Sequence, residues 1–192
     1  MRGPNRLKRC VGLTVALFFV ISAVAFAGDN AGESNAVQDI RTKCAAIDGG
    51  KGYKKVQIDV LDRSANGGVA VGYFEKKKLM KIVENSFGES GNMTGEYYFD
   101  DDKLIFVFIQ GRRYKHPETA EEDFGPVHCV EEDRFYFRNN KLIRKLTRWR
   151  DSSGNIMPSG YPDYFTPETS EIDLMKDVGE LENRIKRQAT QA

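Results

Sequence analysis

The sequence predicts an α+β protein in which an antiparallel β-meander of about seven strands, built from repeated hairpins, is flanked by an N-terminal and a C-terminal helix. Three observations predict this class: a phrase that occurs three times, a helical stripe of apolar residues near each end, and an alternating strand pattern between them. The phrase is Tyr-Phe, three polar residues, Lys-Leu, and Ile or Met, at residues 73–80, 98–105 and 136–143.

Each Tyr-Phe phrase predicts one hairpin. An aromatic pair and an aliphatic pair around a polar tetrad suit two strands that fold back through a two-residue turn. Apolar residues fall on both faces of each hairpin, so both faces of the sheet need cover. The phrases begin 25 and then 38 residues apart, and the extra length of the second interval falls between Gly111 and Pro126.

The hairpins resemble MORN-type repeats, which are short β-hairpin units with a similar Tyr-x-x-x-x-Lys-Leu pattern. This chain departs from the family in two ways. The turn glycine of MORN repeats is missing in all three copies, and the spacing of the copies is irregular. The resemblance therefore implies hairpins and assigns no residue a role.

Two helices are expected to cover the sheet. Apolar residues recur at intervals of three and four at both ends of the chain, as on a helix that buries one side. The first stripe lies within residues 33–47 and comprises Val37, Ile40, Cys44 and Ile47. The second follows a helix-start signal at Thr166-Pro167-Glu168 and comprises Ile172, Met175, Val178, Leu181 and Ile185.

Between the first helix and the first phrase, the pattern predicts two strands. Val56, Ile58 and Val60 alternate with polar residues, as in a half-buried strand. Asn66-Gly67 supplies the residues of a tight hairpin turn, and Val69 to Phe74 forms the return strand.

Residues 1–27 predict a cleaved secretory signal peptide. Four basic residues precede an apolar run that ends at Ala25-Phe26-Ala27, an A-x-A site. The alternative is a membrane anchor, for which the run from Val11 to Ala27 is short. We therefore expect an exported protein, periplasmic or secreted, with residues 28–192 as a single domain and without a membrane span after processing.

The charge pattern gives no argument for nucleic acid as a partner. The signal peptide holds four of the 29 Lys and Arg residues and none of the 28 acids, so the remaining chain has a net charge of −3. Acidic and basic residues are also interspersed rather than clustered along the chain.

Two cysteines remain after processing, Cys44 and Cys129. An even number of cysteines in an oxidising compartment most simply predicts one structural disulfide. A redox role would favour a close C-x-x-C pair, which the sequence lacks.

Three groups of residues could form a metal-binding or catalytic site, and each has a simpler interpretation. Asp100–Asp102 offers oxygen ligands, but the other two phrases place Lys and Asn in the same slots, which favours a solvated turn. His116 and His128 are spaced too widely for a usual zinc pair, and neither lies near a nucleophile motif. Residues 131–133 are three acids that could serve glycoside chemistry, although such clusters arise by chance in an acid-rich chain. The sequence predicts no catalytic residue, no metal site and no cofactor.

Two loops are candidates for recognition. For the first loop, the alternative is a charged surface loop without a partner. For the second, the alternative is that its aromatic side chains only fix the loop to the core. The candidate binding loop contains Arg112, Arg113, Tyr114, Lys115 and His116, and the candidate aromatic loop contains Tyr161, Tyr164 and Phe165.

Three functions remain open. The leading hypothesis is a non-catalytic binding or inhibitory module of the cell envelope whose partner is a protein or a glycan. A hydrolase of envelope polymers is the second, favoured by two carboxyl groups about 5 to 10 Å apart of which one has a raised pKa. A structural part of an envelope assembly is the third, favoured by an exposed apolar patch.

Overall fold

The computed structural model describes residues 31–115, 125–157 and 171–191. The predicted signal peptide, His116, the predicted helix start at 166–168 and the candidate aromatic loop with Tyr161, Tyr164 and Phe165 lie outside these ranges. The elements in chain order are α1 (Ala31–Gly49), β1 (Lys54–Asp59), β2 (Gly68–Glu75), β3 (Lys78–Gly88), β4 (Gly91–Asp100), β5 (Lys103–Tyr114), β6 (Val127–Arg138), β7 (Lys141–Asp151), β8 (Ile156–Met157) and α2 (Glu171–Gln191).

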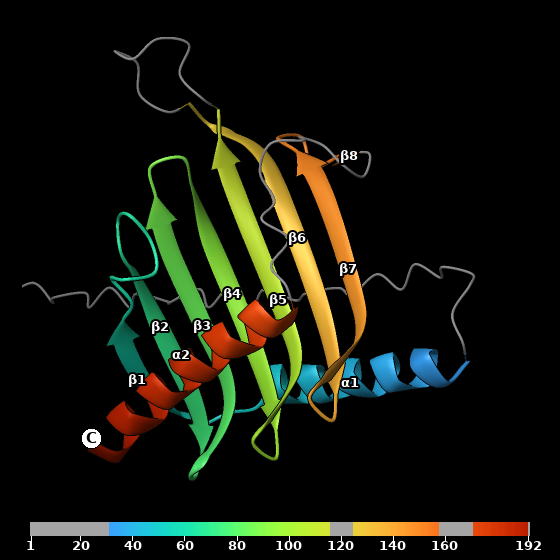
Figure 1. The fold of residues 1–192 in the computed structure, drawn as a ribbon, viewed down its shortest axis with the longest axis vertical. Coiled ribbons are helices and arrows are strands. Elements are labelled where there is room, and N and C mark those ends of the chain that lie inside the picture. The colour runs from blue at the N-terminus through green and yellow to red at the C-terminus, as the bar shows by residue number, and fades with distance from the viewer. Residues whose placement is uncertain (1–30, 116–124, 158–170, 192) are drawn as a thin grey trace, which may run out of the picture.

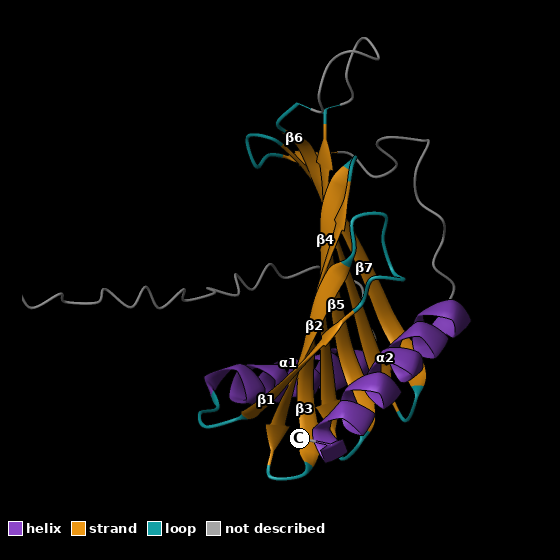
Figure 2. Cartoon of the chain, turned by 90° about the vertical axis from the view of Figure 1, so that its left-hand side faces the viewer, coloured by secondary structure: helices purple, strands orange, loops and turns teal. Residues whose placement is uncertain are grey.

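The strands form one antiparallel sheet in which every strand pairs with its neighbours in the sequence, from β1 to β8. The two helices lie on opposite faces of this sheet (Figures 1 and 2). The predicted class is confirmed, with eight strands instead of seven. The additional strand, β8, has only two residues, which is too short to leave an alternating pattern in the sequence.

Each Tyr-Phe phrase forms a hairpin as predicted. In all three, the ladder shifts between the Tyr and the Phe, so that one residue of the return strand has no partner in the ladder. That residue is Met80, Ile105 or Ile143. A bulge of this kind turns two consecutive side chains towards the same face and increases the local twist.

The hairpin turns contain positive φ angles, which residues other than glycine rarely adopt. Asp101 and Asp102 have φ angles of 48° and 59°, and Asn139 and Asn140 have φ angles of 52° and 59°. Two consecutive positive φ angles define the turn that matches the twist of a two-residue hairpin. Asn and Asp tolerate this region better than other residues, so they serve in place of the missing glycines.

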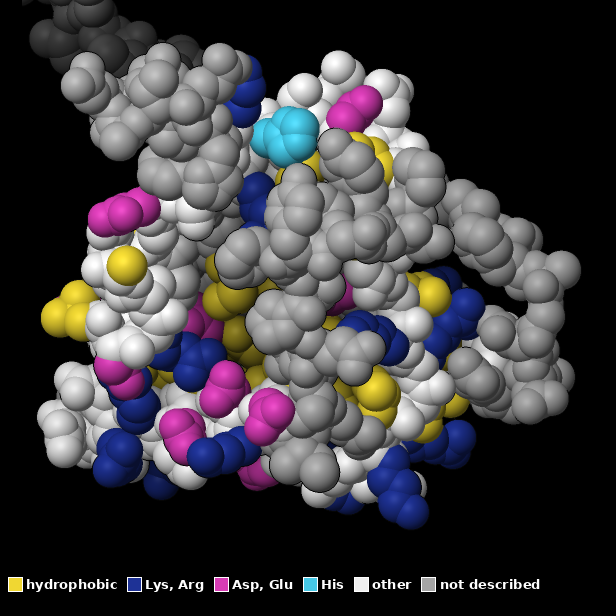
Figure 3. All heavy atoms as spheres, turned by 45° about the horizontal axis from the view of Figure 1, so that its top comes forward, with side chains coloured by type: hydrophobic (Ala, Val, Ile, Leu, Met, Phe, Trp, Pro, Cys, Tyr) yellow, Lys and Arg dark blue, Asp and Glu magenta, His cyan; other side chains and the backbone are white. Residues whose placement is uncertain are grey.

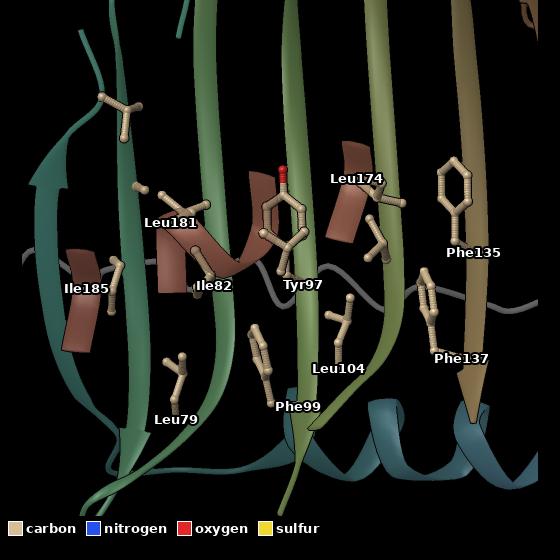
Figure 4. Packing of buried hydrophobic residues seen from close by; sticks show 14 of the residues in the cluster. Leu79, Ile82, Tyr97, Phe99, Leu104, Phe135, Phe137, Leu174, Leu181 and Ile185 are labelled. Atoms are coloured by element: carbon tan, nitrogen blue, oxygen red, sulfur yellow. The ribbon is translucent and has the colours of Figure 1, made fainter. Parts of the chain in front are cut away.

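The larger core lies between the sheet and α2. Figure 4 shows side chains of β3 to β6 that point towards Leu174, Leu181 and Ile185 of the helix. Phe99, Phe137 and Leu79 come from the phrases themselves and are at most 2% exposed. The phrases therefore supply the core by sending their Phe and Leu residues to this face.

The second core lies between the sheet and α1. Val37, Ile40, Cys44 and Ile47 of the helix are buried, which confirms the first predicted stripe. They pack against Tyr98 and Tyr136, with Met80, Ile105 and Ile143 at the bulges. The Tyr of each phrase thus faces α1 while the adjacent Phe faces α2.

The connection from β1 to β2 is longer than the predicted tight turn. Residues 60–67 separate the strands, and only Gly67 of the predicted Asn66-Gly67 pair has a positive φ, of 73°. The backbone N–H of Asn66 donates to the carbonyl of Phe87 on β3 at 2.9 Å. The loop is held by this contact with the sheet instead of by a hairpin turn.

The predicted disulfide is wrong. Cys44 and Cys129 are both buried free thiols. Cys44 lies in the core beneath α1, whereas Cys129 is an even number of residues from Phe135 and Phe137 on β6 and therefore faces the α2 side as they do. The sheet separates the two sulfur atoms, so no disulfide can join them without unfolding.

Neither helix in the described part of the chain combines the length and the apolar character that crossing a membrane requires.

Candidate functional site

The helices leave one end of the sheet uncovered. In Figures 1 and 2, β4 to β7 extend beyond both helices at the end opposite the Tyr-Phe turns. On the α1 side of β6, the side chains beyond the helix are Arg134, Glu132 and Val130. Functional residues can lie here because neither α1 nor α2 packs against this part of the sheet.

Four arginines surround Glu132 on this uncovered end. Arg134 is two residues away on β6, Arg148 lies directly opposite on β7, Arg150 lies diagonally on β7, and Arg112 lies diagonally on β5. Neighbouring positions of this kind are about 5 to 8 Å apart. We call these four arginines and Glu132 the arginine surface.

Glu132 neutralises only part of this charge. Its Oε2 atom lies 3.1 Å from Nη2 of Arg134, and its Oε1 atom lies 3.7 Å from Nε of Arg150. Neither Arg112 nor Arg148 pairs with another residue in the described ranges. Because guanidinium groups stay charged at all relevant pH values, the arginine surface carries a net charge of +3.

An aromatic ring borders the arginine surface. The guanidinium carbon of Arg134 lies 5.0 Å from the centre of the Phe108 ring. Stacking on this ring reduces the freedom of the arginine, which lowers the entropy lost when the guanidinium binds a partner. The surface can bind carboxylates or phosphates by paired hydrogen bonds.

The α2 side of the same end contains a different group of polar residues. Glu131 is 9% exposed, and its Oε1 atom has no hydrogen-bond partner. Burial, reinforced by the charge of Asp133 and opposed by Arg113, raises the pKa of Glu131 to about 7. Trp149 lies directly opposite on β7. Figure 3 shows hydrophobic side chains at the bottom of a hollow on this side of the molecule.

Glu131 and Asp133 form a carboxyl pair on one strand. They are two residues apart on β6 and share a face, which puts their Cα atoms about 7 Å apart. Oγ1 of Thr147 donates to Oδ1 of Asp133. Two carboxyl groups on one face, one of them with a raised pKa, are the arrangement that acid catalysis of glycoside cleavage uses.

A third polar group lies where α1 ends, near β1 to β3. Nζ of Lys81 lies 2.8 Å from Oδ1 of Asp48, 2.8 Å from Oε2 of Glu96 and 2.7 Å from the hydroxyl of Tyr98. The Tyr98 hydroxyl donates to Oε2 of Glu96 at 2.6 Å. These contacts raise the pKa of Lys81 against the opposing effect of burial, so this lysine is a fixed cation and not a nucleophile.

The predicted recognition residues do not form one loop. Arg112, Arg113 and Tyr114 belong to β5, which continues further than predicted. Arg112 points to the α1 side, whereas Arg113 points to the α2 side, where its Nη2 atom lies 3.6 Å from Glu131. Tyr114 accepts a hydrogen bond from Asn92 on β4. Lys115 follows the strand and donates its backbone N–H to the carbonyl of Pro126.

Sequence reasoning missed most of the residues of the arginine surface. The sequence did contain a signal for this surface. Arg144, Arg148 and Arg150 are an even number of residues apart in β7, and the alternation of side chains in a strand places such residues on one face. The pKa of Glu131 left no signal, since the burial of Glu131 depends on neighbouring strands. Among the described residues, no group of three or more His, Cys, Asp and Glu side chains is arranged to hold a metal ion.

Comparison with known proteins found no match: no family model, no curated protein and no solved structure resembles this chain closely enough to be recognised. The likeness of the hairpins to MORN-type repeats is therefore not supported by a family match. The argument for function depends on the residues themselves.

Proposed function

We propose that this protein is an exported, non-catalytic binding module of the cell envelope that holds an acidic protein partner on the arginine surface. One observation carries the proposal: four arginines meet around a single carboxylate on a part of the sheet that neither α1 nor α2 covers. Two of these guanidinium groups, those of Arg112 and Arg148, have no partner in the described chain.

The local charge differs from that of the whole chain. Residues 28–192 have a net charge of −3, whereas the arginine surface has a net charge of +3. Such a contrast steers an acidic partner to one place and orients it on approach. Arginine and aromatic residues are also enriched where protein partners bind, which favours a protein over a glycan.

The test compares a charge-reversed variant with a matched control. Arg112→Glu/Arg148→Glu changes the two unpaired guanidinium groups and leaves the pairs of Glu132 with Arg134 and Arg150 in place. Arg138→Glu changes an exposed arginine that ends β6, next to the β6–β7 turn, at the opposite end of the sheet. Each tagged protein is used to capture partners from an envelope extract at low and at high salt.

We expect the wild type and the Arg138→Glu variant to capture the same acidic protein at low salt, and to lose it as salt screens the charges. The Arg112→Glu/Arg148→Glu variant should bind that purified protein at least tenfold more weakly. Capture of an acidic glycan instead of a protein would support the glycan alternative. Equal binding by all three proteins would refute a role for this surface.

The export part of the proposal has its own test. If residues 1–27 are removed on export, the intact mass of the exported protein corresponds to a chain that begins at Gly28. A product that retains the apolar run from Val11 to Phe26 would contradict cleavage and would support a membrane anchor.

A hydrolase of envelope glycans is the second candidate function. The pair of Glu131, with a pKa of about 7, and Asp133 on the same face supports it. In this role Glu131 would protonate the leaving oxygen and Asp133 would stabilise the cationic transition state or attack the anomeric carbon.

Release of soluble sugars from purified envelope glycan tests this alternative. Glu131→Gln and Asp133→Asn should each reduce the rate by at least a hundredfold, because each removes one half of the acid pair. Glu89→Gln, at an exposed residue in the β3–β4 turn, should leave the rate unchanged. Absence of sugar release by the wild type, or equal rates in all four proteins, would exclude the hydrolase.

A further inference from the structure

A pocket with a volume of about 400 Å³ opens where α1 meets the sheet near β1, β2 and β3. This volume falls within the range of sites that bind small molecules. The pocket shares no residue with the arginine surface or with the pair of Glu131 and Asp133. Its lining residues are Ile47, Asp48, Gly50, Lys51, Gly52, Tyr53, Lys55, Tyr73, Lys81 and Val83.

Two tyrosine rings form one wall of the pocket. The Tyr53 and Tyr73 ring centres lie 6.3 Å apart, and the ring planes are perpendicular. The Tyr53 hydroxyl donates to the carbonyl of Ile47 at 2.9 Å, near the end of α1. A Cβ atom on Gly50 would overlap the Tyr53 hydroxyl, so glycine at this position allows the ring to lie where it does. The wall is therefore fixed before any ligand arrives.

Two lysines at the pocket have no acidic partner in the described ranges. Lys51 and Lys55 are both exposed, and no carboxylate pairs with either ammonium group. Nζ of Lys55 lies 5.2 Å from the centre of the Tyr73 ring. In contrast, Lys81 uses its hydrogens on Asp48, Glu96 and Tyr98. Two cations thus remain available for an anionic group beside an aromatic wall.

The pocket also offers a fixed hydrogen-bond acceptor. The side chain of Asp48 is 50% exposed, and Lys81 holds its Oδ1 atom in place by donating a hydrogen bond at 2.8 Å. Each carboxylate oxygen can accept more than one hydrogen bond. A hydroxyl group of a ligand can therefore donate to Asp48 without disturbing the contacts of Lys81.

We infer that this pocket binds a sugar ring that carries an acidic group. The tyrosine rings can stack against the apolar face of the sugar, Lys51 and Lys55 can hold its carboxylate or phosphate, and Asp48 can accept a ring hydroxyl. The acidic group is expected because Lys51 and Lys55 of the lining have no carboxylate partner in the described ranges, whereas Lys81 is already paired with Asp48 and Glu96. Hydroxyl groups on the ring are expected because the Asp48 carboxylate would otherwise face the ligand without a hydrogen-bond donor.

The experiment uses the folded protein from Gly28 onwards and four probes. Glucuronic acid carries a carboxylate, glucose 6-phosphate carries a phosphate, glucose is neutral, and benzoate is an anionic ring without hydroxyls. Binding is followed by NMR through the backbone amide signals of Lys51, Gly52 and Tyr53. We expect glucuronic acid, glucose 6-phosphate or both to shift these signals in a saturable way, and glucose and benzoate to bind at least tenfold more weakly.

Two variants locate the binding within the pocket. Lys55→Gln removes one of the available cations and should weaken binding of the acidic sugar about tenfold, as expected for the loss of a charge-assisted hydrogen bond. Lys54→Gln is the matched control, because Lys54 pairs with Phe74 and points to the other face of the sheet.

The three possible failures are distinct. No saturable shift with either acidic sugar would overturn the inference. Glucose or benzoate binding as tightly as the acidic sugars would show that the proposed ligand class is wrong. Equal weakening by Lys54→Gln and Lys55→Gln would show a general charge effect instead of a site. None of these results depends on the partner of the arginine surface.

Discussion

Nε of Arg63 lies 2.6 Å from Oε1 of Glu84, and this contact joins the loop between β1 and β2 to the buried face of β3. Glu84 is 0% exposed. Its second oxygen accepts a hydrogen bond from the Tyr97 hydroxyl at 2.8 Å, and Ser86 donates to Oε1 at 3.2 Å. A carboxylate removed from water is tolerated here because the positive charge of Arg63 and two hydroxyl groups replace its hydration.

The first prediction is that Arg63→Met lowers the free energy of unfolding by about 3 to 5 kcal/mol, since it leaves the Glu84 charge buried without a cation. Urea unfolding monitored by circular dichroism measures this change. Adding Glu84→Gln should recover much of the loss, because the neutral amide keeps an acceptor for Tyr97. A loss below about 1 kcal/mol for Arg63→Met would contradict the assigned role.

The second prediction concerns the pH dependence of stability. Burial raises the pKa of Glu131 to about 7, above its value in the unfolded chain. Between these two pKa values the folded protein holds the proton more tightly, so the contribution of Glu131 to stability decreases as pH rises and is fully lost above about pH 7. The loss should be about 3 kcal/mol.

Urea unfolding of the wild type and of Glu131→Gln at about pH 5 and pH 8 tests this dependence. The amide does not titrate, so the variant should be the more stable protein at the higher pH and should show a smaller change between the two. The same pH dependence in both proteins would mean that another group is responsible.

The third prediction concerns the turn between β6 and β7. Asn140 adopts a φ of 59°, which costs a side-chain-bearing residue energy that glycine avoids. Asn140→Gly should therefore raise the free energy of unfolding by up to about 1 kcal/mol. Lys77→Gly is the control, because Lys77 occupies the equivalent position in the β2–β3 turn without a positive φ. This change should be neutral or destabilising, and stabilisation by both would contradict the explanation.

The fourth prediction is that the chain from Gly28 onwards has two thiols that do not react while it is folded. Burial raises the pKa of Cys44 to about 12 and raises that of Cys129 as well, so almost no thiolate forms at neutral pH. A thiol reagent should label both cysteines only after denaturation. Recovery of a Cys44–Cys129 linked peptide from the folded, exported protein would contradict the structure.

Local patterns in the sequence determined the elements of this protein. The Tyr-Phe phrase predicted three hairpins, and the stripes that include Val37 and Val178 predicted two helices that bury one side. These predictions succeed because turn chemistry and periodicity depend on residues close together in the chain. The same patterns also showed that both faces of the sheet need cover.

The tertiary structure alone decided which elements meet. The disulfide was predicted from the number of cysteines, but the Cys44 side chain lies on the α1 side of the sheet and the Cys129 side chain of β6 faces the α2 side. The loop assigned to Arg112, Arg113 and Tyr114 is strand, because β6 continues to pair with β5 to that point. Neither fact follows from the local sequence.

The candidate sites were also decided by the tertiary structure. Arg112, Arg134 and Arg148 come from three strands, and the pairing register brings them around Glu132. Periodicity shows which residues share a face of one strand, but it does not fix which residues of the next strand lie opposite or where a helix stops covering the sheet. Those relationships depend on packing between distant segments, and they determine here which charges are buried and which remain available to a partner.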